Sequence, residues 1–269
     1  MDAWYAHAVP AATSEVREPP LTARSVILST LLGTDPPRLP VRRLVKVGGL
    51  FGCNEGTVRT ALSRMVGRGE VVAVGDGAYE LGAGQLVRHR RQRQSRAAAT
   101  VEWDGRWRLG VVAGGARSQP ERRALRADLE RLRFAPLRDG VWGRPDNLPH
   151  DRLPEVRERI AGRCNWFVGA PDDDETELVA RLWDLDGWAT RAEGLRREMA
   201  GLLGRLDDGD IDALAPGFVT SAAVLRHLQA DPLLPRELLD RRWPGARLRG
   251  DYDRYDAAYR ALLADWWRT

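Results

Sequence analysis

Residues 54–70, NEGTVRTALSRMVGRGE, combine arginine and hydroxyl side chains in a pattern that suits contact with nucleic acid. Val58, Leu62 and Met65 recur at intervals of three and four residues, so a helix would bury them along one side. The opposite side would then expose a second set of side chains: Thr57, Arg59, Thr60, Ser63 and Arg64. Because arginine pairs bidentately with guanine, and hydroxyls bond to bases or phosphates, this side predicts DNA recognition.

The segments around this helix predict the elements that position it. Asn54 is expected to cap the helix and belongs to the predicted DNA contacts. Two earlier helices are expected at 21–33 and about 41–50, and two short strands flank the turn GDG at 75–77. Three helices followed by a hairpin is the order of a winged helix-turn-helix, whose third helix enters the major groove. The alternative is a solvated helix of an ordinary helical protein.

A run of arginines follows the expected hairpin. The stretch RHRRQRQSR, residues 88–96, holds five arginines and one histidine. Such a run can follow the phosphates of DNA beside the wing, and Arg90 and Arg91 are the predicted phosphate contacts. It can equally be a solvated linker between domains, and the sequence leaves both interpretations open.

The middle and the end of the chain change pattern. Strands and helices are expected in the order βαββαβ, which is typical of a ferredoxin-like domain. Beyond residue 172 the pattern is helical throughout. We therefore predict an α+β protein with the following parts: a flexible tail at 1–20, a winged helix-turn-helix DNA-binding domain at 21–96, a central ferredoxin-like domain at 97–172, and a helical effector and dimerisation domain at 173–269.

Composition excludes several classes of protein. The net charge is only +4, from 42 Lys+Arg and 38 Asp+Glu, but positive charge gathers between residues 38 and 96. No apolar run reaches the roughly 18 residues of a membrane span. The N-terminus does not resemble a secretory signal, so a cytoplasmic location is expected. Two isolated cysteines and four scattered histidines predict no disulfide, no metal site and no cofactor.

Three sets of motifs in the chain resemble the PaaX family, named for the repressor of bacterial phenylacetate degradation. The first is FGCNEGTVRTALSRMVGRG at 51–69, preceded by a helix with Arg24 and Ser25. The second is WDGRW at 103–107 with VWGRP at 141–145. The third is LWDL at 182–185 with DPLLPRELLDRRWPG at 231–245. The resemblance covers essentially everything from Leu21 to Trp266.

This resemblance implies a winged-helix DNA reader, a central domain of the type seen in Cas2 proteins and a helical C-terminal domain. It further implies a homodimeric repressor, released from double-stranded operator DNA by an aryl-CoA thioester, which is phenylacetyl-CoA in the founding case. The chain departs from the family pattern at several positions. Asp76 and Glu80 stand in the wing, where the family is usually basic, and Asp240 stands where proline is common.

The central domain offers aromatic side chains with arginines close by. Trp103, Trp107 and Trp142 can form a pocket for a flat acyl group, and Arg106 and Arg144 can pair with the phosphates of a CoA thioester. These five residues are the predicted effector site. The alternative is an aromatic core with solvated arginines, because aromatic residues in strands usually belong to the core.

A catalytic alternative rests on Glu102, with His89 thirteen residues earlier. A carboxylate packed against the indole of Trp103 can have a raised pKa and transfer protons. The arrangement bears a weak similarity to bacterial Pictet–Spengler enzymes, which condense an aromatic amine with a carbonyl compound. In this alternative the chain is an enzyme acting on a small aromatic metabolite. Otherwise Glu102 is a surface residue and the protein is not an enzyme.

Overall fold

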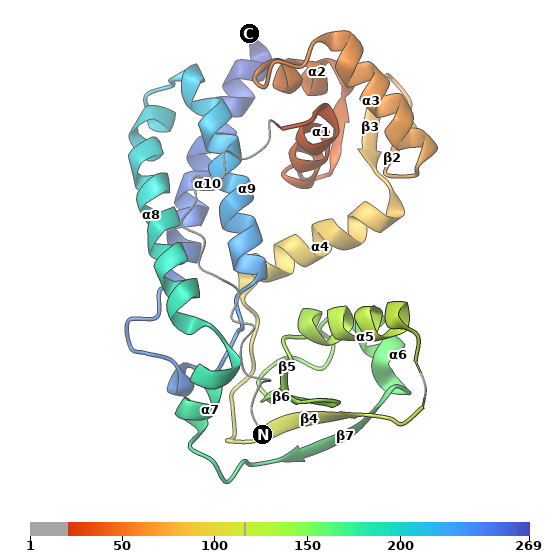
Figure 1. The fold of residues 1–269 in the computed structure, drawn as a ribbon. Coiled ribbons are helices and arrows are strands. Elements are labelled where there is room, and N and C mark those ends of the chain that lie inside the picture. Colours follow the sequence, from red (N-terminus) through yellow and green to blue (C-terminus); the bar gives the residue numbers. More distant parts are fainter. Residues whose placement is uncertain (1–20, 116) are drawn as a thin grey trace, which may run out of the picture.

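The computed structural model describes residues 21–115 and 117–269, and the predicted tail at 1–20 lies outside them. Figure 1 shows three parts. A unit of three helices and a small sheet lies at one end, and a four-stranded sheet with two helices lies at the other. Long C-terminal helices lie beside the first unit, and a shorter one lies beside the four-stranded sheet. The predicted α+β class, with a central antiparallel sheet and a helical C-terminal region, is confirmed.

The first unit has the element order expected of a winged helix-turn-helix. Its helices are α1 (Ala23–Leu32), α2 (Val41–Gly49) and α3 (Glu55–Gly67). Its strands are β1 (Arg38–Pro40), β2 (Val71–Val74) and β3 (Ala78–Leu81), in the order β1-β3-β2. Strand β1 was not predicted, and it adds a third antiparallel strand to the expected hairpin.

Short turns set the direction of α3 and of the hairpin. Gly52, between α2 and α3, has φ +72°, a conformation that glycine adopts without the steric cost of a Cβ atom. Asp76 and Gly77, in the three-residue loop between β2 and β3, both have positive φ, as the tight turn of a short hairpin requires. Val58, Leu62 and Met65 of α3 are buried against the other two helices, as predicted.

The central part has the predicted βαββαβ order. Its elements are β4 (Trp107–Val112), α5 (Gln119–Arg131), β5 (Ala135–Arg138), β6 (Val141–Pro145), α6 (Pro154–Ala161) and β7 (Cys164–Gly169). All neighbouring strands are antiparallel, in the order β5-β6-β4-β7. Helices α5 and α6 lie together over one face of this sheet (Figure 1). Trp107 points to the other face, where it meets α7 and residues 234–238.

The C-terminal part is helical. It contains α7 (Glu175–Leu182), α8 (Leu185–Asp207), η1 (Ile211–Ala213), α9 (Leu214–Gln229), η2 (Arg236–Leu238) and α10 (Gly245–Arg268). Helices α8, α9 and α10 share one hydrophobic core. The sequence predicts a helix over 236–243, but only the single turn η2 forms there. Prolines 235 and 244 bracket this stretch, and Leu234 and Leu238 are buried against the central sheet.

Helix α4 (Ala83–Ala97) connects the first unit to the rest of the chain (Figure 1). It contains the whole arginine run, and its C-terminal half packs against α9. The end of α10 returns to α2, where the guanidinium of Arg43 lies 4.9 Å from the Trp267 ring and Lys46 Nζ lies 4.7 Å from the Trp266 ring. The first unit is therefore held to the C-terminal helices at both ends.

Candidate nucleic-acid interface

The start of α3 is fixed by a side-chain cap. Asn54 Oδ1 accepts a hydrogen bond from the backbone N–H of Thr57 at 2.8 Å and a second one from the Thr57 hydroxyl at 2.9 Å. Both residues are exposed. The cap uses the oxygen of Asn54, so its amide nitrogen is the group that it can offer to a base edge.

The remaining predicted residues lie together on the exposed side of α3. Thr60, Ser63 and Arg64 are exposed. Arg59 is also exposed and donates to Glu55 Oε1 at 2.7 Å, one helical turn earlier. An exposed ion pair of this kind contributes little to stability, so Arg59 can exchange Glu55 for a phosphate or a base at small cost.

A shallow depression between the start of α1 and α3 extends this surface. Thr22 and Arg24 of the first helix border it, together with Thr60 and Arg64 of α3. Arg24 donates to both carboxylate oxygens of Glu70, at 2.8 and 2.9 Å, and this hydrogen bonding lowers the pKa of the Glu70 carboxyl. The prediction of DNA contacts did not include Thr22 and Arg24. Their position in the first turn of α1, which is a common place for phosphate contacts, is the signal that could have indicated them.

The wing presents acidic rather than basic side chains. Asp76 occupies the turn, and Glu80 of β3 pairs across the sheet with Arg38 of β1. Around the predicted DNA surface, α3 and the start of α1 therefore supply arginines, whereas the turn of the wing carries a carboxylate.

The arginine run combines two environments in one helix. Arg90 is exposed on α4, whereas the side chain of Arg91 lies outside the described part of the structure. Arg96 donates to Asp253 at 2.7 Å and to Asp256 at 2.9 Å, both on α10. The end of the run therefore has a structural role, which neither sequence interpretation predicts.

The structure does not bring the five predicted effector residues into one pocket. Trp107 is buried on the face of the central sheet that meets α7, and its indole N–H donates to Glu175 at 3.0 Å. Trp142 is buried on the opposite face, under α5. Trp103 is half-buried and donates to the carbonyl oxygen of Arg106, whose exposed guanidinium pairs with Asp104.

Arg144 is enclosed rather than available to a ligand. Only 2% of it is exposed, and its guanidinium donates to Asn147 Oδ1 at 2.6 Å and to the carbonyl oxygen of Leu233 at 3.1 Å. Further bonds reach the carbonyl oxygens of Pro145, Leu132 and Arg133. The expectation that Arg144 pairs with a phosphate is therefore corrected, because its donors bond to the protein itself.

The residues of the catalytic alternative lie in different surroundings. Glu102 is exposed in the segment between α4 and β4, whereas His89 is buried in α4. Glu102 therefore lies in solvent rather than in the apolar surroundings that the catalytic alternative assumes. Among the described residues, no group of histidine, cysteine, aspartate or glutamate is placed to hold a metal ion. Across the same residues, no helix combines the length and the apolar character of a membrane span.

Comparison with known proteins adds three findings. The family model described as PaaX-like protein matches residues 22–85, and the model described as PaaX protein central Cas2-like domain matches residues 100–175. The solved structure of the uncharacterized protein Rv0674 from Mycobacterium tuberculosis is similar, with a TM-score of 0.71 and 37% sequence identity. The similarity covers 91% of this chain and 98% of that one. No curated protein matches the chain.

Proposed function

Since the chain belongs to the PaaX family, we propose that it is a one-component transcriptional regulator that binds operator DNA through α3. The observation that carries this proposal is the exposed side of α3. There Thr60, Ser63 and Arg64 lie free of the hydrophobic core, on a helix whose other side is buried by Val58 and Leu62. A helix of this kind can enter the major groove without unfolding any part of the protein.

Each residue of this surface has a distinct role in the proposal. Arg59 and Arg64 contact guanine edges, where the planar guanidinium forms two parallel hydrogen bonds. Thr60 and Ser63 bond to phosphates or bases, and Asn54 and Thr57 set the start of the helix and contact the adjacent backbone. Further contacts to phosphates, which give affinity without sequence preference, come from three arginines: Arg24, Arg90 and Arg91.

The finer parts of the proposal follow from the resemblance to the family. We propose that the protein acts in the cytoplasm as a homodimeric repressor, released by an aryl-CoA thioester formed in aromatic catabolism. Of the predicted effector residues, Trp103 and Arg106 are the two with accessible surface on the central domain. Release by a ligand requires that the ligand bind the DNA-bound and the free states with different affinity.

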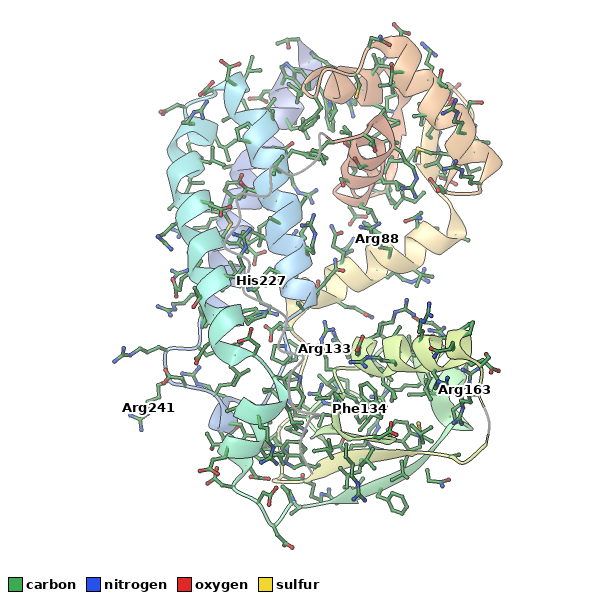
Figure 2. The ribbon with its side chains drawn as sticks, in the orientation of Figure 1. Arg88, Arg133, Phe134, Arg163, His227 and Arg241 are labelled. Carbon is green, nitrogen blue, oxygen red and sulfur yellow. The ribbon has the colours of Figure 1, made fainter. Side chains whose placement is uncertain are left out.

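Substitutions on α3 test the DNA-binding surface. Arg59→Ala and Arg64→Ala are each expected to weaken specific binding by about 1–3 kcal/mol, because each removes a bidentate base contact. The measurement is a fluorescence anisotropy titration with DNA from the region upstream of the gene, at two salt concentrations. The matched control is Arg241→Ala, because Arg241 projects into solvent from the loop before α10 (Figure 2).

The control separates a specific contact from the general loss of a positive charge. Both α3 variants should lose more affinity for the upstream DNA than for an unrelated duplex, whereas Arg241→Ala should bind both as the wild type does. If both α3 variants keep wild-type affinity for the upstream DNA, α3 is not the reading helix.

A further inference from the structure

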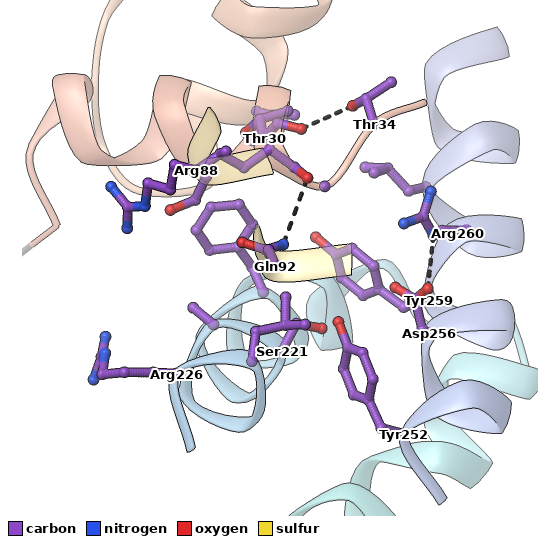
Figure 3. Close-up of a pocket in the computed structure, with 18 of the residues that line it drawn as sticks. Thr30, Thr34, Arg88, Gln92, Ser221, Arg226, Tyr252, Asp256, Tyr259 and Arg260 are labelled. Atoms are coloured by element: carbon purple, nitrogen blue, oxygen red, sulfur yellow. Dashed lines mark hydrogen bonds and ion pairs between the residues drawn. The ribbon is translucent and has the colours of Figure 1, made fainter. Parts of the chain in front are cut away.

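A cavity of about 160 Å³ lies where the first unit (α1–α3 with β1–β3, called the winged unit from here on) meets the C-terminal helices. Its walls come from α1, α2, α4, α9 and α10, so residues far apart in the sequence surround one space (Figure 3). The sequence does not predict this cavity, because its residues come from five helices that only the tertiary structure brings together. It is separate from the central sheet, where the predicted effector residues lie.

The interior of the cavity is largely aromatic and apolar. Phe218 and Ala222 line it from α9, Leu32 from α1, and Tyr252 and Tyr259 from α10. Burial raises the pKa of both tyrosine hydroxyls, so the rings remain neutral at physiological pH. An uncharged aromatic wall favours a flat apolar group through stacking and edge contacts.

Charged side chains occupy particular parts of the lining, and some of them are paired with a carboxylate while others are not. Arg260 donates to Asp256 at 2.9 Å, and Asp256 also accepts from Arg96, whose second partner is Asp253, so these four charges balance. Arg88 of α4 and Arg226 of α9 also line the cavity, both are exposed, and both lie on the side away from Arg260 in Figure 3. Neither has a carboxylate partner among the residues that the structure describes.

The size of the cavity limits what can enter. An enclosed apolar cavity of about 150 Å³ is sufficient for a benzene molecule. A single aromatic ring therefore fits within this volume. The two arginines would add charge-assisted hydrogen bonds to an anionic substituent of that ring.

We propose that this cavity binds a small aromatic anion, with one ring among Phe218, Tyr252 and Tyr259 and its negative group between Arg88 and Arg226. Two sources can supply this chemistry. One is a free aromatic carboxylate, and the other is the aryl end of a CoA thioester whose phosphates reach the arginines. The proposal names the site at which the effector of the proposed regulator acts, and it rests on the proposed function for its effect on DNA.

The position of the cavity explains how such a ligand would change DNA binding. Phe218 contacts the cavity and also packs on Phe51, with ring centroids 5.0 Å apart. Phe51 belongs to the turn that precedes α3. A ligand held between α4, α9 and α10 would therefore bind best to one arrangement of the winged unit relative to the C-terminal helices. Regulation requires such a difference in affinity between the two states of the protein.

Calorimetry with the full-length protein tests the site without reference to DNA. The probes are phenylacetate and benzoate as free acids, phenylacetyl-CoA as the thioester, and CoA and benzyl alcohol as controls for the ring and the charge. The double variant Arg88→Gln, Arg226→Gln is expected to weaken binding of the anionic aromatic probe about tenfold or more. Ala222→Phe, which fills the cavity, is expected to abolish it.

Two further measurements keep these comparisons interpretable. Arg241→Gln is the matched control, because it removes an exposed positive charge far from the cavity (Figure 2) and should leave binding unchanged. Circular dichroism shows whether Ala222→Phe is folded. If it is not, the double arginine variant, which alters only exposed side chains, carries the test alone.

Each result of these titrations either supports or overturns the proposed site. Binding of a free acid with the expected variant pattern supports the proposal and identifies a carboxylate, and the same pattern with phenylacetyl-CoA alone supports it and identifies a thioester. The proposal is overturned if no probe binds, if benzyl alcohol or CoA binds as tightly as its anionic aromatic counterpart, or if the arginine and cavity variants bind like wild type. Binding by a protein with no affinity for upstream DNA would overturn the proposed function and leave the site intact.

Discussion

A buried arginine connects the central domain to the C-terminal part of the chain by hydrogen bonds. Arg144 lies in the interior and bonds to main-chain oxygens on both sides of that junction, including the carbonyl of Leu233. Burial, with further repulsion from Arg133 and Arg152, lowers the pKa of its guanidinium well below the ordinary value. A cation in this environment persists because several acceptors surround it, and removing it takes a hydrogen bond from each of them.

Arg144→Met is therefore expected to destabilise the protein by about 2–4 kcal/mol, since methionine fills similar space but donates no hydrogen bonds. Arg106→Met is the control, because that arginine is exposed and pairs with Asp104 at the surface. The measurement is the free energy of unfolding in urea. If Arg144→Met unfolds like the wild type but binds an aryl-CoA thioester more weakly, the original expectation of an effector contact is correct after all.

Single residues show what the sequence could and could not predict. Asn54 as the cap of α3 follows from local chemistry, because the cap bonds only three residues ahead. The burial of Arg144 does not follow from VWGRP, because its acceptor at Leu233 lies 89 residues away. Arg88 and Arg226 likewise form one site only through packing of α4 against α9, and no spacing within either helix indicates it.

At the scale of elements, the C-terminal end of α4 is bonded to α10, whereas the middle of the same helix is exposed. Arg96 is bound to two carboxylates of α10, and its guanidinium also lies 4.9 Å from the Tyr252 ring. Arg90, six residues earlier in the same helix, is exposed. Arg96 therefore has a structural role that neither sequence interpretation of the arginine run predicts, whereas Arg90 remains a predicted phosphate contact.

These two arginines are expected to respond differently to substitution. Arg96→Ala should lower the free energy of unfolding by about 1–2 kcal/mol, because it removes partly buried ion pairs between α4 and α10. Arg90→Ala should leave stability within about 0.5 kcal/mol. It should instead weaken binding to all DNA sequences alike and reduce the salt slope by about 1. Thermal unfolding and anisotropy titrations at several salt concentrations measure both, and identical behaviour of the two variants would contradict this division.

The elements themselves were predictable where the pattern was local and long enough. The order βαββαβ and the long C-terminal helices follow from periodicity. Strand β1 was missed because it has only three residues, one of them proline, and exists through pairing with β3 forty residues later. The single turn η2 replaced a predicted helix because Leu234 and Leu238 are buried against the central sheet, and this contact depends on tertiary structure.

At the scale of the whole molecule, the winged unit is attached to the C-terminal helices over a broad area. The end of α10 packs on α2, the turn before α3 packs on α9, and α4 bonds to α10. The cavity lies within this same junction. A movement of the C-terminal helices would therefore reach α3 through α2 and the turn before α3, whereas the central sheet lies apart from α3 (Figure 1).

The last expectation concerns symmetry. One recognition helix contacts only a few base pairs, which is too little for a specific operator, so the protein is expected to dimerise through residues beyond Glu175 and to bind an inverted repeat. The centres of the two half-sites should lie about 34–36 Å apart, or a multiple of that distance, because both α3 helices must enter the major groove on the same side of the duplex. Light scattering at micromolar concentration measures the first point, and footprinting of the upstream region measures the second. A monomer in solution together with a footprint that lacks two-fold symmetry would show that a single copy reads its site.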